Sequence, residues 1–274
     1  EEPLAVFKTR VFALGSASPG GMGGLRGVNT VRTVLELGLG AATIIAVSFI
    51  VAPYGRHARS GFGPAIPQRL AWVLMEAPAV FVWGAIYAAG QHAAAPAPLA
   101  MLALWQLHYL QRTLLFPLRI RAEGKTTPLF VVLSAVVFNV LNAYVNARQV
   151  SHFGAYDAAW LTDPRFVLGA LLFVAGFGLN IHADGVLARL RAPGETGYKI
   201  PRGGLFEVVS CPNYLAEMLE WIGWAILTWS LAGASFALYT IANLAPRAIA
   251  HHRWYREKFP DYPPGRRALV PYLL

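Results

Sequence analysis

The sequence predicts an all-α, polytopic integral membrane protein with seven transmembrane helices. Its composition is the first reason: 56% of the 274 residues are hydrophobic and 14% are charged, whereas soluble domains are about 25% charged. The second reason is that seven apolar stretches are each long enough to cross a bilayer as a helix, which takes about 20 residues. The third is that basic residues gather in alternate loops between these stretches.

The predicted spans cover most of the chain after its first 30 residues. They lie at residues 31–52, 70–90, 97–118, 127–147, 165–188, 213–231 and 233–254. The short connection at 231–233 predicts that the last two spans form an antiparallel pair. Residues 1–28 contain no apolar run long enough for a secretory signal. We therefore expect a flexible N-terminal lead-in over 1–28 and a single membrane domain over 29–274.

The distribution of Lys and Arg predicts the orientation of the spans. The loops after the first, third and fifth spans and the C-terminal tail are basic, whereas residues 91–98 carry no basic residue. Basic loops remain in the cytoplasm, so we expect the N-terminus outside and the C-terminus in the cytoplasm. The net charge of +9 is explained by these loops, and we expect no nucleic-acid partner and no obligatory protein partner. The single cysteine, Cys211, excludes an internal disulfide and favours packing; no metal site is predicted.

Three polar residues lie within one apolar helix. At 100° per residue, Asn213, Glu217 and Glu220 fall within about 60° of one another. A carboxylate at membrane depth costs several kcal/mol unless it faces a polar cavity, and such residues therefore indicate a functional site. The alternative is that these acids form hydrogen bonds between helices and hold the bundle together.

A second group of polar residues lies toward the cytoplasmic ends of the later spans. Basic residues beside tyrosines around a polar cavity suit an anionic ligand that carries an aromatic ring, such as a nucleotide. The alternative is a basic surface that binds anionic lipid. The group comprises Asn180, Asp184, Arg191, Tyr198, Lys199, Arg247, His251 and Tyr255.

A third group lies nearer the middle of the predicted membrane. Glu76 is in the second span, close to Pro78, and Tyr109 is in the third span, close to Arg112. A neutral carboxylic acid beside a tyrosine hydroxyl can donate hydrogen bonds to a carbonyl that is gaining negative charge. The alternative is a structural ion pair between Glu76 and Arg112. The sequence has no nucleophile elbow, Walker loop, H-E-x-x-H or G-x-G-x-x-G motif, so acyl transfer, ATP use, zinc proteolysis and a Rossmann domain have no support.

Seven stretches of this sequence resemble the membrane-embedded steroid 5α-reductase family, of which we expect a bacterial member. They run in register from about residue 30 to the C-terminus: Y-G-R-H-A-R-S (54–60), W-x-L-x-E-x-P (72–78), H-Y-x-x-R-T (108–113), G-x-x-x-N-I-H-A-D (176–184), R-A-P-G-E-T-G-Y-K-I-P-R-G-G-L-F (191–206), P-N-Y-L-A-E-M-L-E-W-I-G (212–223) and H-H-R-W-Y-R-E-K-F-P-D-Y-P (251–263).

The resemblance implies a reductase that transfers a hydride from NADPH to the C4=C5 double bond of a 3-oxo-Δ4-steroid. Glu76 and Tyr109 would then hold the 3-keto oxygen as the catalytic residues. The dinucleotide site would be formed by Asn180, Asp184, Arg191, Tyr198, Lys199, Asn213, Glu217, Arg247, His251 and Tyr255. The steroid would enter from the bilayer between early spans, past Trp72, Met75, Val80 and Trp83. We expect a bacterial inner-membrane protein, or an endoplasmic-reticulum protein if the source is a eukaryote.

The sequence departs from the family pattern at two positions. Met75 stands where mammalian members have a glutamine, which removes a hydrogen-bond donor next to Glu76. Lys199 replaces an arginine, so a two-pronged phosphate contact becomes a contact with a point charge.

Three related enzyme classes remain as alternatives. Isoprenylcysteine methyltransferases carry paired glutamates near the position of His251, and sterol C14 and C7 reductases carry a W-G-x-x-R-H segment that is absent here. A trans-2-enoyl-CoA reductase would reduce a conjugated carbonyl with the same cofactor, but we expect it to have a ubiquitin-like N-terminal domain. A non-enzymatic transport or lipid-binding bundle predicts polar residues along a path through the membrane.

Overall fold

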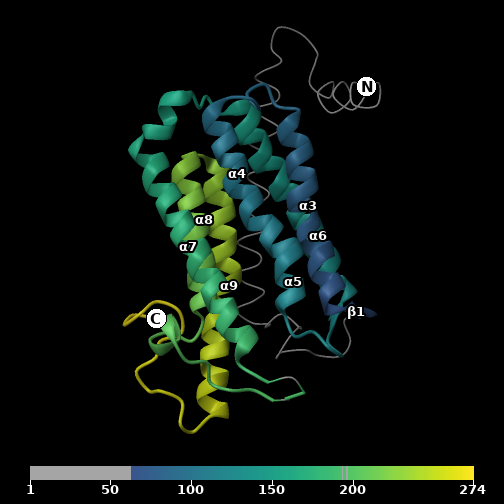
Figure 1. Ribbon diagram of the computed structural model, residues 1–274, viewed down its shortest axis with the longest axis vertical. Coiled ribbons are helices and arrows are strands. Elements are labelled where there is room, and N and C mark those ends of the chain that lie inside the picture. The colour runs from purple at the N-terminus through teal and green to yellow at the C-terminus, as the bar shows by residue number, and fades with distance from the viewer. Residues whose placement is uncertain (1–62, 193, 196) are drawn as a thin grey trace.

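The computed structural model describes residues 63–274 except 193 and 196 (Figure 1). The predicted lead-in, the first span at 31–52 and the motif at 54–60 lie outside the described residues. The described chain is mostly helical, and its long helices run along the long axis of a bundle.

Six of the predicted spans coincide with helical segments; their ends agree within four residues, except that the segment of the fourth span continues six residues further, to Phe153. The segments are α3 Gln68–Ala88; α4 Pro96–Leu110 with η2 Gln111–Leu115 and α5 Phe116–Arg119; α6 Leu129–Arg148 with η3 Gln149–Phe153; α7 Pro164–Arg189; α8 Pro212–Thr228; and α9 Leu231–Lys258. The remaining described elements are short: β1 Ala65–Pro67, β2 Thr126–Pro128, η4 Ala158–Thr162 and η5 Gly204–Glu207.

Three of the described helices are long and apolar enough to cross a membrane. They are Gln68–Ala88, Leu129–Phe153 and Pro164–Arg189. In the third predicted span the continuous α-helix ends at Leu110, because a π turn follows. The structure therefore supports a helical membrane protein, while the number of spans and their orientation stay predictions.

The π turn at Gln111–Leu115 has a local cause. The N–H of Phe116 donates to the carbonyl of Gln111, five residues back. Pro117 follows, and its ring would clash with the carbonyl four residues earlier in a regular α-helix. A wider turn relieves this clash, and such turns are frequent at functional sites.

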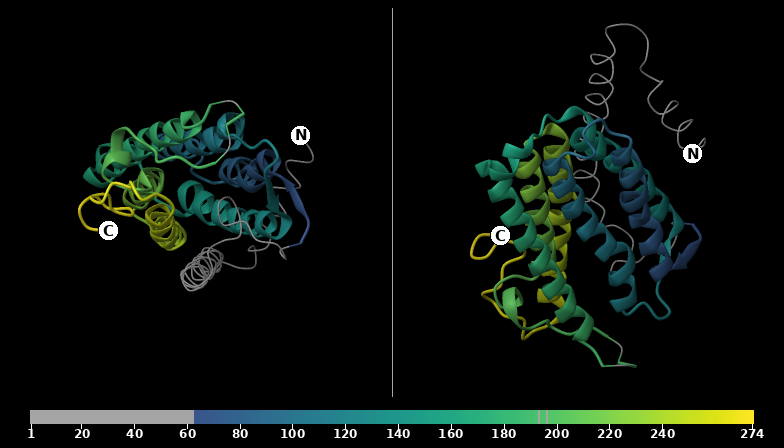
Figure 2. Two further views of the ribbon diagram at one scale, coloured as in Figure 1. Left: turned by 90° about the horizontal axis from the view of Figure 1, so that it is seen from below. Right: turned by 45° about the horizontal axis from the view of Figure 1, so that its top comes forward.

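The connections place alternate loops at opposite ends of the bundle. The loop after α5, the segment between α7 and α8, and the C-terminal tail lie at the same end (Figures 1 and 2). At the other end, Trp229 has a left-handed backbone (φ 42°) that ends α8, and Ser230 caps α9 by accepting from the N–H of Gly233. This two-residue connection confirms the predicted antiparallel pair.

Helices α7 and α8 pack backbone to backbone along a line of glycines. A Cβ at Gly176 would lie 2.6 Å from both the Ala216 oxygen and the Glu220 nitrogen. A Cβ at Gly223 would lie 2.6 Å from the oxygen of Gly169. Such close approach is typical of small residues at membrane helix interfaces.

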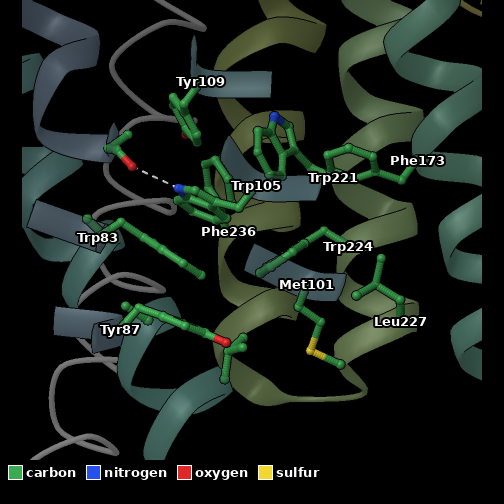
Figure 3. Packing of buried hydrophobic residues seen from close by; sticks show 14 of the residues in the cluster. Trp83, Tyr87, Met101, Trp105, Tyr109, Phe173, Trp221, Trp224, Leu227 and Phe236 are labelled. Carbon is green, nitrogen blue, oxygen red and sulfur yellow. Dashed lines mark hydrogen bonds between the residues drawn. The ribbon is translucent and has the colours of Figure 1, made fainter. Parts of the chain in front are cut away.

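An aromatic core joins α4 to α3, α8 and α9 (Figure 3). Trp105 stacks on Trp83 with ring centroids 5.3 Å apart, contacts Trp221 and Trp224, and donates from Nε1 to the Ala79 carbonyl at 2.8 Å. Trp83 is fully buried in this core. Its expected place at an opening to the bilayer is therefore wrong, because its indole packs inward against α4.

Candidate active site

One cavity of about 480 Å³ lies between the two halves of the bundle. Its volume is within the range of small-molecule sites, about 300–1,000 Å³. Residues of the group predicted near the middle of the membrane, on α3 and α4, line this cavity together with polar residues of the later spans, on α7, α8 and α9. Among the predicted residues that line it are Trp72, Met75, Glu76, Tyr109, Asp184, Asn213, Glu217 and Arg247.

Glu76 and Tyr109 face this cavity from neighbouring helices. Tyr109 is buried, and its ring packs against Trp105 at a centroid distance of 4.9 Å. Asn139 on α6 donates to the Met75 carbonyl at 2.6 Å, so α6 holds the turn of α3 that carries Glu76. Both residues line the same cavity, and their role at a carbonyl ligand stays a prediction.

Arg112, on the π turn, links the two polar groups. Its guanidinium lies 3.0 Å from the Asp184 carboxylate and 3.6 Å from that of Glu217. It lies against the rings of Trp72 and Phe116, 5.0 and 4.3 Å from their centroids. Within the described part of the chain, its ion pairs are made with these two acids, so the alternative of a structural Glu76–Arg112 ion pair does not hold.

The acid and amide side chains of α7 and α8 form a connected set. The Asn180 amide donates to the Asn213 carbonyl at 3.0 Å, and the Asn213 amide donates to Asp184 at 3.5 Å. Asn180 is buried behind the wall, whereas Asp184 and Asn213 reach the cavity. Asn180 therefore positions the backbone at the start of α8 and contacts no cavity space.

Glu220 does not face the cavity with the other two polar residues of α8. Its carboxylate lies 2.7 Å from Nδ1 of His108 and is fully buried. Asn213 and Glu217 line the cavity. Both interpretations of this helix thus apply: the first two residues belong to the site, and the third joins α8 to α4.

The predicted residues of the loop after α7 lie away from the cavity. Arg191 donates to the Gly197 carbonyl at 2.9 Å, and Lys199 pairs with Glu195 at 2.5 Å. The ring of Tyr198 packs edge-on against Trp254 with centroids 4.7 Å apart. These contacts leave the dinucleotide roles of this loop as predictions.

The predicted residues of α9 divide between the cavity and the tail. Arg247 lines the cavity. Nε2 of His251 lies 3.2 Å from the hydroxyl of Tyr214, itself a cavity residue. Tyr255 is buried and stacks on Tyr262 of the tail at 5.3 Å. Tyr255 thus packs the tail against α9.

The sequence prediction missed several cavity residues. They belong to α6 and α9 and include Asn139, Tyr239, Thr240 and Asn243. Asn243 lies one helical turn before Arg247, and that spacing is a signal that could have found it. Among the described residues, no group of three or more His, Cys, Asp or Glu is placed to hold a metal ion. Cys211 is buried at the start of α8, as predicted for a packing residue.

Comparison with known proteins decides the family. Residues 125–274 match the family described as 3-oxo-5-alpha-steroid 4-dehydrogenase. Steroid 5-alpha-reductase DET2 of Gossypium hirsutum is 47% identical over 84% of this chain and 92% of its own length. The chain belongs to the steroid 5-alpha-reductase family. The 3-oxo-5-alpha-steroid 4-dehydrogenase 1 of Bos taurus is 44% identical over 88% of this chain and 95% of its own, and that of Homo sapiens is 40% identical over 87% and 93%.

Membership of this family makes the protein an oxidoreductase and decides against the methyltransferase alternative. The relatives named above come from a plant and from mammals. They give no support to the expectation of a bacterial member.

Proposed function

We propose that this reductase converts 3-oxo-Δ4-steroids to 5α-3-oxosteroids by adding hydride from NADPH across the C4=C5 double bond. One observation carries the proposal: Glu76 and Tyr109, the pair that we assign to the steroid carbonyl, share a single cavity with the acid and amide side chains of α7 and α8. A carbonyl site and a cofactor site must adjoin for a hydride to pass between them.

The donor set of the cavity fits a nicotinamide dinucleotide. Asp184, Asn213 and Glu217 offer acceptors and an amide for ribose hydroxyls and a carboxamide, and Arg247 offers a cation for a phosphate. NADPH supplies the hydride, and the protein supplies position and electrostatics. Arg191, Lys199, His251 and Tyr255 would contact the outer part of the cofactor; this assignment is supported by the family resemblance.

Glu76 and Tyr109 lower the barrier at the steroid oxygen. As hydride reaches C5, the electrons of the double bond move through C4 toward the 3-keto oxygen, and an enolate forms. Donors already placed at that oxygen stabilise it more than they stabilise the ground-state ketone. A proton then adds at C4, so that one hydride and one proton are consumed for each double bond.

The membrane arrangement supplies two routes to the cavity. We infer seven spans with the N-terminus outside and the C-terminus in the cytoplasm, since the basic loops after α5 and α7 and the basic tail lie at one end of the bundle. The charged cofactor enters from that end. The steroid enters from the bilayer past Trp72 and Met75, which line the cavity on α3.

The test is turnover by the purified protein in detergent. We expect NADPH oxidation with testosterone or progesterone, slower oxidation of NADH, and a 5α-reduced product by mass spectrometry and chromatography against standards. A trans-2-enoyl-CoA of long chain serves as the competing substrate. Reduction of the enoyl-CoA without reduction of either steroid would overturn the proposal.

A further inference from the structure

A buried imidazole–carboxylate pair lies beside the cavity, and its imidazole lines the cavity. Nδ1 of His108 lies 2.7 Å from Oε1 of Glu220, and the two residues are 3% and 0% exposed. Oε2 of Glu220 is buried without a hydrogen-bond partner among the described residues. The carboxylate of Glu220 thus has its hydrogen bond with His108. Its second oxygen is unsatisfied within the described part of the chain, and burying an unsatisfied acceptor costs free energy of folding.

The backbone of Glu220 is fixed where α7 and α8 approach each other closely. A Cβ on Gly176 would lie 2.6 Å from the Glu220 nitrogen and 2.9 Å from its Cα. The ring of His108 in turn packs edge-on against Tyr109 and Trp221, with centroids 4.8 and 4.7 Å away. The imidazole therefore has one orientation, set by contacts on three sides.

This orientation leaves Nε2 of His108 for the cavity. His108 lines the cavity, whereas Glu220 does not. In the neutral tautomer that donates Nδ1–H to this carboxylate, Nε2 is a hydrogen-bond acceptor. Among the described residues, the hydrogen bond shown for the His108 ring is the one between Nδ1 and Glu220, so Nε2 is the ring nitrogen left to meet a ligand.

The pair lies at the inner end of the polar face that runs along α7 and α8. On α8, Asn213, Glu217 and Glu220 follow on successive turns from the end with the basic loops. The phosphates of a cofactor belong at that end, so its nicotinamide lies at the opposite, inner end. The hydride donor must also reach a steroid held by Tyr109, which is the residue after His108.

We propose that Nε2 of His108, held by Glu220, accepts a hydrogen bond from the carboxamide amino group of the nicotinamide. The inference rests on the proposed function. This contact selects one rotation of the nicotinamide ring and so determines which face of the ring is turned toward the steroid. His108 is a cofactor-binding residue in this arrangement, and Glu220 is a positioning residue that acts through it.

The test compares the binding of NADP⁺ with that of its 3-acetylpyridine analogue, in which a methyl ketone replaces the carboxamide. The analogue keeps the carbonyl oxygen as an acceptor and loses the amino donor. Dissociation constants are measured by tryptophan fluorescence quenching in detergent, without turnover. For His108→Phe we expect the preference for NADP⁺ over the analogue to fall about five- to tenfold relative to the wild type, the value of one neutral hydrogen bond.

Variants of Glu220 distinguish an effect on the orientation of His108 from an effect on folding. Glu220→Gln keeps an oxygen acceptor for Nδ1–H and should keep the preference, whereas Glu220→Met should lose it as His108→Phe does. His182→Phe is the matched control, because His182 is exposed on α7 and does not line the cavity. Thermal unfolding of each variant shows whether it is folded at the temperature of the measurement.

The outcomes distinguish the two proposals. A wild-type protein that binds neither dinucleotide would overturn the proposed cofactor. A protein that reduces steroid with NADPH, but whose preference is the same in the wild type and in a folded His108→Phe variant, would overturn only the carboxamide contact. Loss of the preference in His182→Phe would also overturn it, because the effect would then not depend on the cavity.

Discussion

The guanidinium of Arg112 lies 3.0 Å from the carboxylate of Asp184, which joins the π turn after α4 to α7 across the cavity. Without the π turn at Gln111–Leu115, the residues that follow would be rotated relative to α4, since that turn spans five residues per hydrogen bond. The local distortion before Pro117 thus determines where the positive charge of the site lies.

Removing this charge should destabilise the protein and weaken cofactor binding. Arg112→Ala leaves Asp184 and Glu217 without their cation, and breaking a buried ion pair from one side typically costs about 3–5 kcal/mol. The matched control is Arg69→Ala, because the Arg69–Glu123 pair is exposed (50% and 74% for the side chains) and should contribute less than about 1 kcal/mol. Thermal unfolding in detergent measures both; equal shifts in Tm would contradict the prediction.

Glu76 and Tyr109 should affect turnover much more than cofactor binding. Tyr109→Phe removes a hydroxyl donor from the steroid oxygen, and loss of such a donor typically costs about 10²–10³-fold in kcat. Glu76→Gln replaces the acid proton by a weaker amide donor and should lower kcat by less. The dissociation constant for NADPH should stay unchanged, since neither group belongs to the acid and amide set of α7 and α8. Full turnover by Glu76→Gln would show that the proton of Glu76 is not used.

The positions of the helices could be predicted because they depend on short-range features. Apolar length, Pro at helix starts and polar breaks are local, and they predicted the ends of the six helical segments within four residues, except for the end of the α6–η3 segment. The π turn could not be predicted in this way, although Pro117 is visible in the sequence. A proline can either kink a helix or widen the turn before it, and the sequence alone does not show which of the two occurs.

The site was predictable in composition but only partly in geometry. A helical stripe indicates which residues share a face, yet Glu220 and Asn213 differ by two turns and meet different neighbours. Whether Glu220 faces the cavity depends on His108, 112 residues earlier in the chain. The predicted place of Trp83 at an opening to the bilayer was wrong for a similar reason. Nothing in the sequence of its own helix shows that Trp105 packs against it.

A hydrogen-bond donor at position 75 should improve steroid binding. Met75 lines the cavity beside Glu76, and a glutamine amide there could donate to the 3-keto oxygen. Met75→Gln should lower the apparent KM for a 3-oxo-Δ4-steroid several-fold, about the value of one hydrogen bond. Met75→Leu is the apolar control and should leave KM near the wild-type value. If neither KM nor kcat changes in Met75→Gln, the side chain does not reach the steroid.

Acid should weaken the start of α7 through Asp163. Its carboxylate accepts from the Arg165 N–H at 2.8 Å and from the Arg165 side chain at 2.9 and 2.8 Å, and these hydrogen bonds lower the pKa of Asp163 from 3.8 to about 2. A depressed pKa contributes stability that is present above pH 3.8 and lost as pH falls through about 2. Asp163→Asn should therefore reduce the acid dependence of Tm over this range. An identical pH profile for both proteins would contradict the prediction.

The seam between α7 and α8 should not accept a methyl group at Gly176. The Cβ of an alanine would lie 2.6 Å from the oxygen of Ala216 and the nitrogen of Glu220, both backbone atoms that cannot rotate away. The helices would have to separate, and overpacking of this kind costs about 1–3 kcal/mol. Gly178→Ala on the same helix is the matched control, because its Cβ meets nothing within 4 Å and alanine favours the helix by about 1 kcal/mol. We therefore expect Tm to fall for Gly176→Ala and to hold or rise for Gly178→Ala. Separation of the helices should also shift Glu220 and His108, so Gly176→Ala should weaken NADP⁺ binding. If neither Tm nor NADP⁺ binding changes in this variant, α7 and α8 are not packed this closely.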